Sequence, residues 1–219
     1  MRIVRTLHRR CAVVVTLFVL AHLANHAAAL GGIAAHVRFM EGARLVYRQP
    51  VVEAVLLLCV ALQAASGLWL AGAGWKRRSG WIAWLQAVSG AYLALFLLIH
   101  VGAVLVGRGV LELDTNVHFA AAGLQVWPYQ LFFVPYYFLA LAAIFAHLGC
   151  ALARRARSKA AVAAGVPLAA GVVFSGLVLA ALMGKLYPYE VPQAYKNTYQ
   201  AQDGPRGVLA PRGTDLAPR

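Results

Sequence analysis

The sequence has little charge, and acidic residues are especially scarce. Only 12% of its 219 residues are charged, with 20 Lys or Arg against 7 Asp or Glu, whereas an average soluble domain has about 25% charged residues. Hydrophobic residues make up 62% of the chain, and the mean hydropathy is +0.69. A net charge of +13 would indicate nucleic-acid binding in a soluble protein. Here the basic residues lie between long apolar runs, so membrane topology explains them and no nucleic-acid partner is expected.

The motifs of several enzyme classes are missing as well. The three cysteines, Cys11, Cys59 and Cys150, each stand alone in an apolar run, and no CxxC, CxxCH or zinc-type spacing occurs. Neither a disulfide framework nor covalent haem attachment is therefore indicated. The chain has no dinucleotide fold, flavin site or cysteine cluster, so it offers no flavin or iron–sulfur chemistry of its own. The short alternating segments of membrane β-strands are also absent.

Five apolar segments are long enough to cross about 30 Å of hydrocarbon at about 1.5 Å per residue. They run roughly over 11–30, 51–72, 82–107, 129–153 and 161–184, and charge, proline or glycine bounds each of them. We therefore expect an all-α, five-helix transmembrane bundle over residues 1–184. Residues 185–219, rich in Pro, Gly, Gln and Tyr, are expected to form an extended, partly disordered exterior tail with no helical period and no second soluble domain.

The distribution of charge predicts the orientation of the spans. Basic residues favour the cytoplasmic side, so the N-terminus is expected inside and the C-terminus outside. The inner side would hold Arg2, Arg5, Arg9, Arg10, Lys76, Arg77, Arg78, Arg154, Arg155, Arg157 and Lys159. The seven acidic residues all fall on the other side or at its boundary, namely Glu41, Glu53, Glu112, Asp114, Glu190, Asp203 and Asp215.

A cleaved signal peptide is the alternative interpretation of the first span. A basic start, an apolar stretch and "AAA" at 27–29 fit that pattern. Cleavage would leave four spans and the same topology. We favour an uncleaved helix, because the span is full length and carries His22 and His26 in its second half.

Two of the histidines within the predicted spans share one depth. His22 lies eight residues before Leu30, about 12 Å from the outer end of its span. His100 lies seven residues before Gly107, about 10 Å from the same end. Neutral imidazoles at one depth on different helices suit the two axial positions of haem b iron. We therefore predict His22 and His100 as iron ligands, with hydrogen bonding between helices without a cofactor as the alternative.

The other five histidines are expected to have different roles or to lie outside the predicted spans. His26, one turn outward of His22, is expected to contact a haem propionate, water or a quinone rather than iron. His147 lies near the inner end of its span, where the second span offers Gln63, a poor ligand of haem iron. One haem b is therefore favoured over two, with His147 and Gln63 as weaker cofactor-binding candidates. His8 falls in the basic N-terminal stretch, and His36 and His118 in exterior loops.

Small and charged residues add three weaker signals. "QAASG" at 63–67 and "QAVSG" at 86–90 repeat one pattern that would admit either a porphyrin or a neighbouring helix. Glu53 is a candidate for proton exchange with an exterior quinone, although stabilisation of a helix N-terminus is favoured. Arg38, Arg44 and Arg48 are candidate partners of haem propionates, or else solvated loop charges.

Taken together, these residues resemble a known family. "LHRR", "HLANH", "QAASGLW" and "QAVSGAYLALFLLIH", within residues 7 to 153, are similar to the cytochrome b membrane anchor of succinate:quinone oxidoreductases, in its single-chain, five-helix type. The resemblance implies a bundle with b haems and a quinone site, bound to flavoprotein and iron–sulfur subunits. In diheme members the outer ligand pair falls on His22 and His100, and the inner pair on Gln63 and His147. Gln63 departs from that pattern, because the expected histidine is absent.

The expected function is electron transfer between soluble partner subunits and quinone, in a multi-pass protein of the cell inner membrane that contacts lipid. The chain could not oxidise succinate alone. A haem-free scaffold or small-molecule carrier is the alternative, with which Gln63 and the aromatic stretch 127–137 are compatible. A transition-metal site at His22 and His26 ranks last, because no carboxylate or thiolate is near in the sequence.

Overall fold

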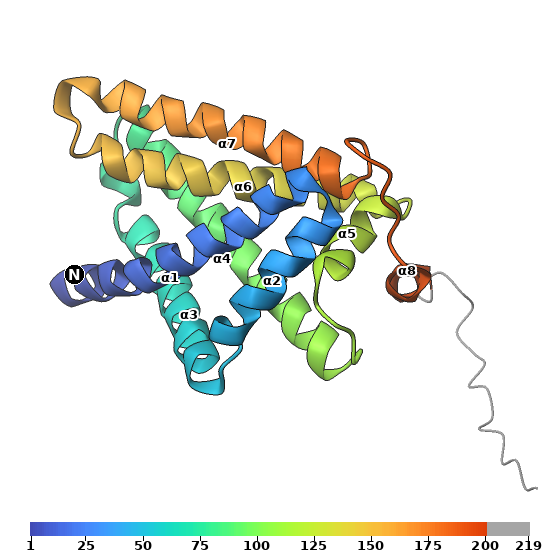
Figure 1. The fold of residues 1–219 in the computed structure, drawn as a ribbon. Helices are drawn as coiled ribbons and strands as arrows, with labels where there is room; N and C mark the ends of the chain where they lie inside the picture. Colours follow the sequence, from blue (N-terminus) through green and yellow to red (C-terminus); the bar gives the residue numbers. More distant parts are fainter. Residues whose placement is uncertain (201–219) are drawn as a thin grey trace, which may run out of the picture.

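The structure, a computed structural model, describes residues 1–200, and every regular element in that range is helical (Figure 1). Five of the helices are long and apolar enough to cross a membrane. They are α1 (Arg2–Ala28), α3 (Pro50–Ala73), α4 (Trp81–Gly109), α6 (Gln130–Ala153) and α7 (Ala160–Leu182). The predicted all-α architecture with five long apolar helices is therefore confirmed, and it is compatible with a membrane bundle.

The first long helix is longer than the sequence pattern indicated. It begins at Arg2 rather than near residue 11, so the basic stretch is part of the helix. Arginine permits this extension, because its aliphatic stem can lie along apolar surface while the guanidinium reaches water. His8, in that basic stretch, consequently lies on α1 itself, before the predicted start of the first span.

Three shorter helices occupy segments that the sequence pattern left as loops or tail. They are α2 (Ile33–Tyr47), α5 (Val117–Gln125) and α8 (Gln193–Gln200), with 3₁₀ turns at Ala29–Gly31, Trp75–Arg77 and Arg157–Lys159. The Asn116 side chain caps α5 by accepting hydrogen bonds from the backbone N–H groups of His118 (2.8 Å) and Phe119 (3.3 Å). His36 and His118 therefore lie on helices, and their assignment to loops was wrong.

The closest helix pair is α6 and α7, which run side by side in Figure 1. Glycine makes this approach possible. A Cβ on Gly171 would lie 2.6 Å from the Cβ of Phe145, and one on Gly149 would lie 3.0 Å from the carbonyl oxygen of Ala164. A hydrophobic core lies at one end of this helix pair, where side chains of α1, α5, α6 and α7 meet. It includes Leu23, Leu124, Leu141, Val178 and Leu182.

Two tyrosines join α4 to α6. The Tyr92 hydroxyl donates to the carbonyl oxygen of Tyr136 at 2.9 Å, and the Tyr136 hydroxyl donates to that of Phe96 at 3.2 Å. Away from these contacts, α1, α3 and α4 leave space between themselves and α6. That space is the cavity described below.

The first part of the expected tail packs against the bundle instead of extending from it. The Tyr187 hydroxyl donates to the carbonyl oxygen of Ala29 at 2.6 Å, and the Val191 N–H donates to Oε1 of Gln125 at 3.0 Å. Val191 is buried in the same core. The prediction of an extended segment without a helix is therefore wrong for 185–200, because tyrosine and valine side chains there find apolar partners. Residues 201–219, with Asp203 and Asp215, lie outside the described residues.

Candidate functional site

A cavity of about 1970 Å³ lies between α1, α3, α4 and α6. Typical ligand sites occupy about 300–1,000 Å³, so this space exceeds what one small ligand requires. Its walls are mostly apolar. Six of the seven histidines line it, namely His8, His22, His26, His36, His100 and His147.

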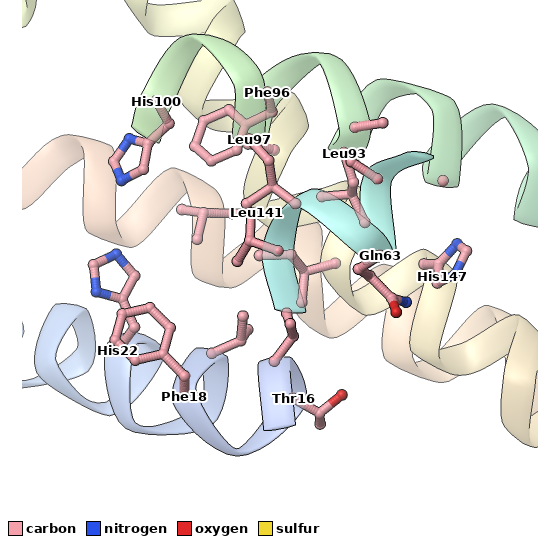
Figure 2. A pocket seen from close by; sticks show the side chains of 18 of the residues that line it. Thr16, Phe18, His22, Gln63, Leu93, Phe96, Leu97, His100, Leu141 and His147 are labelled. Carbon is pink, nitrogen blue, oxygen red and sulfur yellow. The ribbon is translucent and has the colours of Figure 1, made fainter. Parts of the chain in front are cut away.

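His22 and His100, named the outer pair after the side of the membrane expected for them, face each other across this cavity. Figure 2 shows the rings of His22, on α1, and His100, on α4, opposite each other. Their ring centres are 6.1 Å apart. A metal bound to both imidazoles, with metal–nitrogen distances of about 2 Å, would separate the ring centres by about 6 Å. The two histidines predicted from their depth are thus brought together at a spacing that fits one iron between them.

A phenylalanine stacks on each ring of the outer pair. Phe18 stacks on His22 with ring centres 5.6 Å apart, and Phe96 stacks on His100 at 5.0 Å. In both cases the phenylalanine lies four residues before the histidine, on the same helix face. Such stacking orients the imidazoles. The repeated Phe-x-x-x-His spacing was present in the sequence, and reasoning from depth alone did not use it.

Two further histidines extend this group outward. His26 and His22 share a hydrogen bond between their Nε2 atoms at 3.3 Å, and the His26 ring centre lies 5.4 Å from that of His36. His36 is only 2% exposed. Burial, with smaller contributions from His22, His118 and Arg44, lowers the pKa of His36 to about 4, so it is neutral at pH 7. Among the described residues neither nitrogen of His36 has a hydrogen-bond partner.

The predicted arginines bind protein carboxylates. Arg44 donates two hydrogen bonds to Asp114, at 2.7 and 3.1 Å, and does not line the cavity. Burial of Asp114 opposes its ionisation, but the hydrogen bonds and charge of Arg44 dominate and hold the pKa of its carboxyl below the usual value. Arg48 lines the cavity, lies 3.7 Å from Asp114 and donates to Thr115 at 3.2 Å. Arg38 is exposed and does not line the cavity.

Glu53 also has a cationic partner. Its carboxylate forms an ion pair with Arg108, at the end of α4, and both residues line the outer end of the cavity. Sequence reasoning did not single out Arg108. This ion pair fixes the Glu53 carboxylate at the wall of the cavity.

The other end of the cavity, named the inner end after its expected side of the membrane, holds His147, Gln63 and His8. In Figure 2, Gln63 and His147 lie at the end opposite the outer pair. His147 Nδ1 lies 3.1 Å from the carbonyl oxygen of Gln86 and 3.3 Å from Oγ of Ser89. The side-chain nitrogen of Gln63 lies 3.2 Å from Nε2 of His8, whose Nδ1 lies 2.9 Å from Oγ of Ser66. His8 is the cavity residue that the sequence pattern missed at this end.

No protein-family model, curated protein or solved structure matches this chain. The resemblance to a cytochrome b anchor therefore stays a prediction from the residues themselves. Within residues 1–200, no three His, Cys, Asp or Glu side chains are grouped so as to hold a metal ion.

Proposed function

We propose that the chain is a haem b-binding membrane subunit that passes electrons between flavoprotein and iron–sulfur partner subunits and membrane quinone. The observation that carries the proposal is the outer pair, with ring centres 6.1 Å apart across a large apolar cavity. The stacked phenylalanines support it, because axial ligands need a fixed ring orientation.

Each group around the outer pair has a part in this proposal. Haem, when bound, supplies one-electron redox chemistry. His22 and His100 would hold its iron, and Arg48 would offer a charge-assisted hydrogen bond to a propionate. Within the described residues, Nδ1 of His26 and both ring nitrogens of His36 have no hydrogen-bond partner, so a quinone carbonyl at this end of the cavity would find hydrogen-bond donors there. Glu53, held by Arg108, would exchange protons with that quinone.

The proposed orientation places the N-terminus in the cytoplasm of a cell with the chain in its inner membrane. Basic residues from separate segments gather at one end of the bundle. Arg5 and Arg77 line one small pocket beside the N-terminus, and Arg154 donates to the Gln86 side chain at 2.8 Å. Because basic residues are retained on the cytoplasmic side, this end would meet the soluble partner subunits.

The test is the absorption spectrum of the purified full-length protein and of single histidine variants. The wild type should show a reduced b-type spectrum. His22→Ala and His100→Ala should each remove the haem held by the outer pair, because a six-coordinate iron needs both imidazoles. His26→Ala should keep it. His118→Ala is the matched control, because this histidine lies outside the cavity and pairs with Tyr189. A stable, colourless wild type from haem-replete cells would overturn the proposal.

A haem-free scaffold or carrier is the second candidate, and one contact favours it. His22 and His26 already satisfy each other through the hydrogen bond between their Nε2 atoms. Membrane histidines can serve helix packing in this way. On that alternative, His22→Ala would lower thermal stability without any spectral change, which the same preparations would reveal.

A further inference from the structure

We propose that the inner end of the cavity binds a second haem b, with His8 of α1 and His147 of α6 as the axial ligands. This inference rests on the proposed function and deepens it. The sequence pattern pairs His147 with Gln63, which is a poor ligand. The structure brings a different imidazole, His8, within 3.2 Å of the Gln63 side chain, and both His8 and His147 line the cavity.

The hydrogen bonds of His147 determine which of its nitrogens is available. A carbonyl oxygen can only accept, so the contact of Nδ1 with the Gln86 carbonyl oxygen at 3.1 Å requires a proton on Nδ1. Nε2 then carries the lone pair, and no hydrogen bond within residues 1–200 uses it. An imidazole oriented through Nδ1–H, with Nε2 toward a cavity, is the arrangement found in protein metal ligands.

His8 is held in the same tautomer. The Ser66 hydroxyl donates to the Leu62 carbonyl oxygen at 2.5 Å, so its oxygen is left to accept from Nδ1–H of His8 at 2.9 Å. Nε2 of His8 then accepts from the amide nitrogen of Gln63 at 3.2 Å. Gln63 thus donates a hydrogen bond to the same His8 nitrogen that would bind iron. Its role is to orient His8, and it is not itself a ligand.

The repeated sequence pattern supplies both histidine sites. "QAASG" places Ser66 at Nδ1 of His8, and "QAVSG" places Ser89 at Nδ1 of His147. The glycine after each serine lies against the same ring. A Cβ added at Gly67 would lie 3.3 Å from Cε1 of His8, and one added at Gly90 would lie 2.9 Å from Cε1 of His147. Two equivalent supports for two imidazoles are more than plain helix packing requires.

Space and charge at this end fit a second porphyrin. Along α1, His8 and His22 are fourteen residues apart, or about 21 Å of helix axis, so the inner site does not overlap the outer pair. Arg5, Arg9 and Arg154 also line the cavity near the inner histidines. Their guanidinium groups would pair with propionates there.

The experiment is haem quantification per chain on the purified full-length protein, combined with a redox titration of its absorption spectrum. The wild type should bind two haems and titrate in two steps. His8→Ala and His147→Ala should each bind one haem and keep the step assigned to the outer pair, which His22→Ala removes. His118→Ala should keep both.

A cavity-rescue variant separates ligation from folding. His8→Gly should bind one haem, and added imidazole should restore the second haem and its redox step, which a merely structural histidine would not allow. One haem in the wild type, lost in His22→Ala and unaffected by His8→Ala, would overturn the inner site and leave the proposed function intact. No haem in the wild type would overturn both.

Discussion

At the scale of single residues, Gly90 controls how closely His147 approaches α4. A Cβ at this position would lie 2.9 Å from Cε1 of a ring that hydrogen-bonds to Gln86 and Ser89 of the same helix. The ring cannot withdraw without weakening those bonds. Gly90 is therefore expected to matter for space rather than for backbone conformation.

We expect Gly90→Ala to destabilise the protein by about 1–3 kcal/mol through overpacking, which outweighs the about 0.5–1 kcal/mol that alanine gains over glycine in a helix. Thermal unfolding in detergent measures this effect. Gly102→Ala is the matched control, because Gly102 lies on the same helix with nothing within 4 Å of an added Cβ. Gly102→Ala should leave stability unchanged or raise it. Equal behaviour of the two variants would show that the contact with His147 carries no weight.

Depth along a helix predicted which residues would meet at the outer end, since His22 and His100 face each other in the structure. The same reasoning missed His8 and His36 for two different reasons. His8 was missed because the hydropathy pattern places the start of the first span after the N-terminal arginines, whereas the helix already begins at Arg2. His36 was lost because its burial comes from α2 folding back against the bundle, which no periodicity within the segment reveals.

At the scale of elements, Gln125 ties the C-terminal segment to the bundle. Its side-chain nitrogen donates to the carbonyl oxygen of Leu182 at 2.9 Å, and its oxygen accepts from the N–H of Val191 at 3.0 Å. One side chain thereby holds the end of α7 and the segment after it against α5. Val191 is only 2% exposed, so its N–H would have little access to water without this partner.

Gln125→Ala should therefore cost about 1–3 kcal/mol for the unpaired backbone groups and loosen residues 185–200. Hydrogen exchange at Val191, together with limited proteolysis after Lys185, measures the loosening. Gln193→Ala serves as the control, because within residues 1–200 that side chain makes only exposed hydrogen bonds, to Asn197 and Gln200. If protection at Val191 is the same in both variants, Gln125 does not hold the segment.

The long helices were predictable because each needs only its own apolar length, while the short ones were not. Helices α2, α5 and α8 have 15, 9 and 8 residues, and isolated helices shorter than about 12–15 residues are marginal in water. Packing against the long helices, and the Asn116 cap for α5, stabilise elements of this kind. Such contacts join residues that are far apart in the chain, so a local pattern does not contain them.

At the scale of the whole molecule, the orientation in the membrane would decide which end of the cavity lies near the proposed soluble partners. Eleven basic residues and no acidic ones fall at the end expected inside. Ser79 and Ser158 are exposed in turns at that end, and Ala194 is exposed on α8 at the other. These three positions suit site-directed labelling.

In intact cells, a cysteine at Ser79→Cys or Ser158→Cys should react only with membrane-permeant reagents, because basic turns stay in the cytoplasm. A cysteine at Ala194→Cys should also react with impermeant reagents. The unsubstituted chain is the control, since Cys11 and Cys150 are buried and all three native cysteines lie in long helices. The reverse labelling pattern would invert the orientation of the bundle and place His22 and His100 beside the proposed cytoplasmic partners.

The order of the helices along the chain has a consequence for biosynthesis. Both imidazoles of the outer pair lie on α1 and α4, so they are available before the fourth long helix, α6, has left the ribosome. His147 arrives only with α6, and the closely packed partner of α6 is the last long helix to be made. During N-terminal-first synthesis, the proposed haem of the outer pair could therefore bind while the wall formed by α6 and α7 is still absent, and the inner end of the cavity would be completed afterwards.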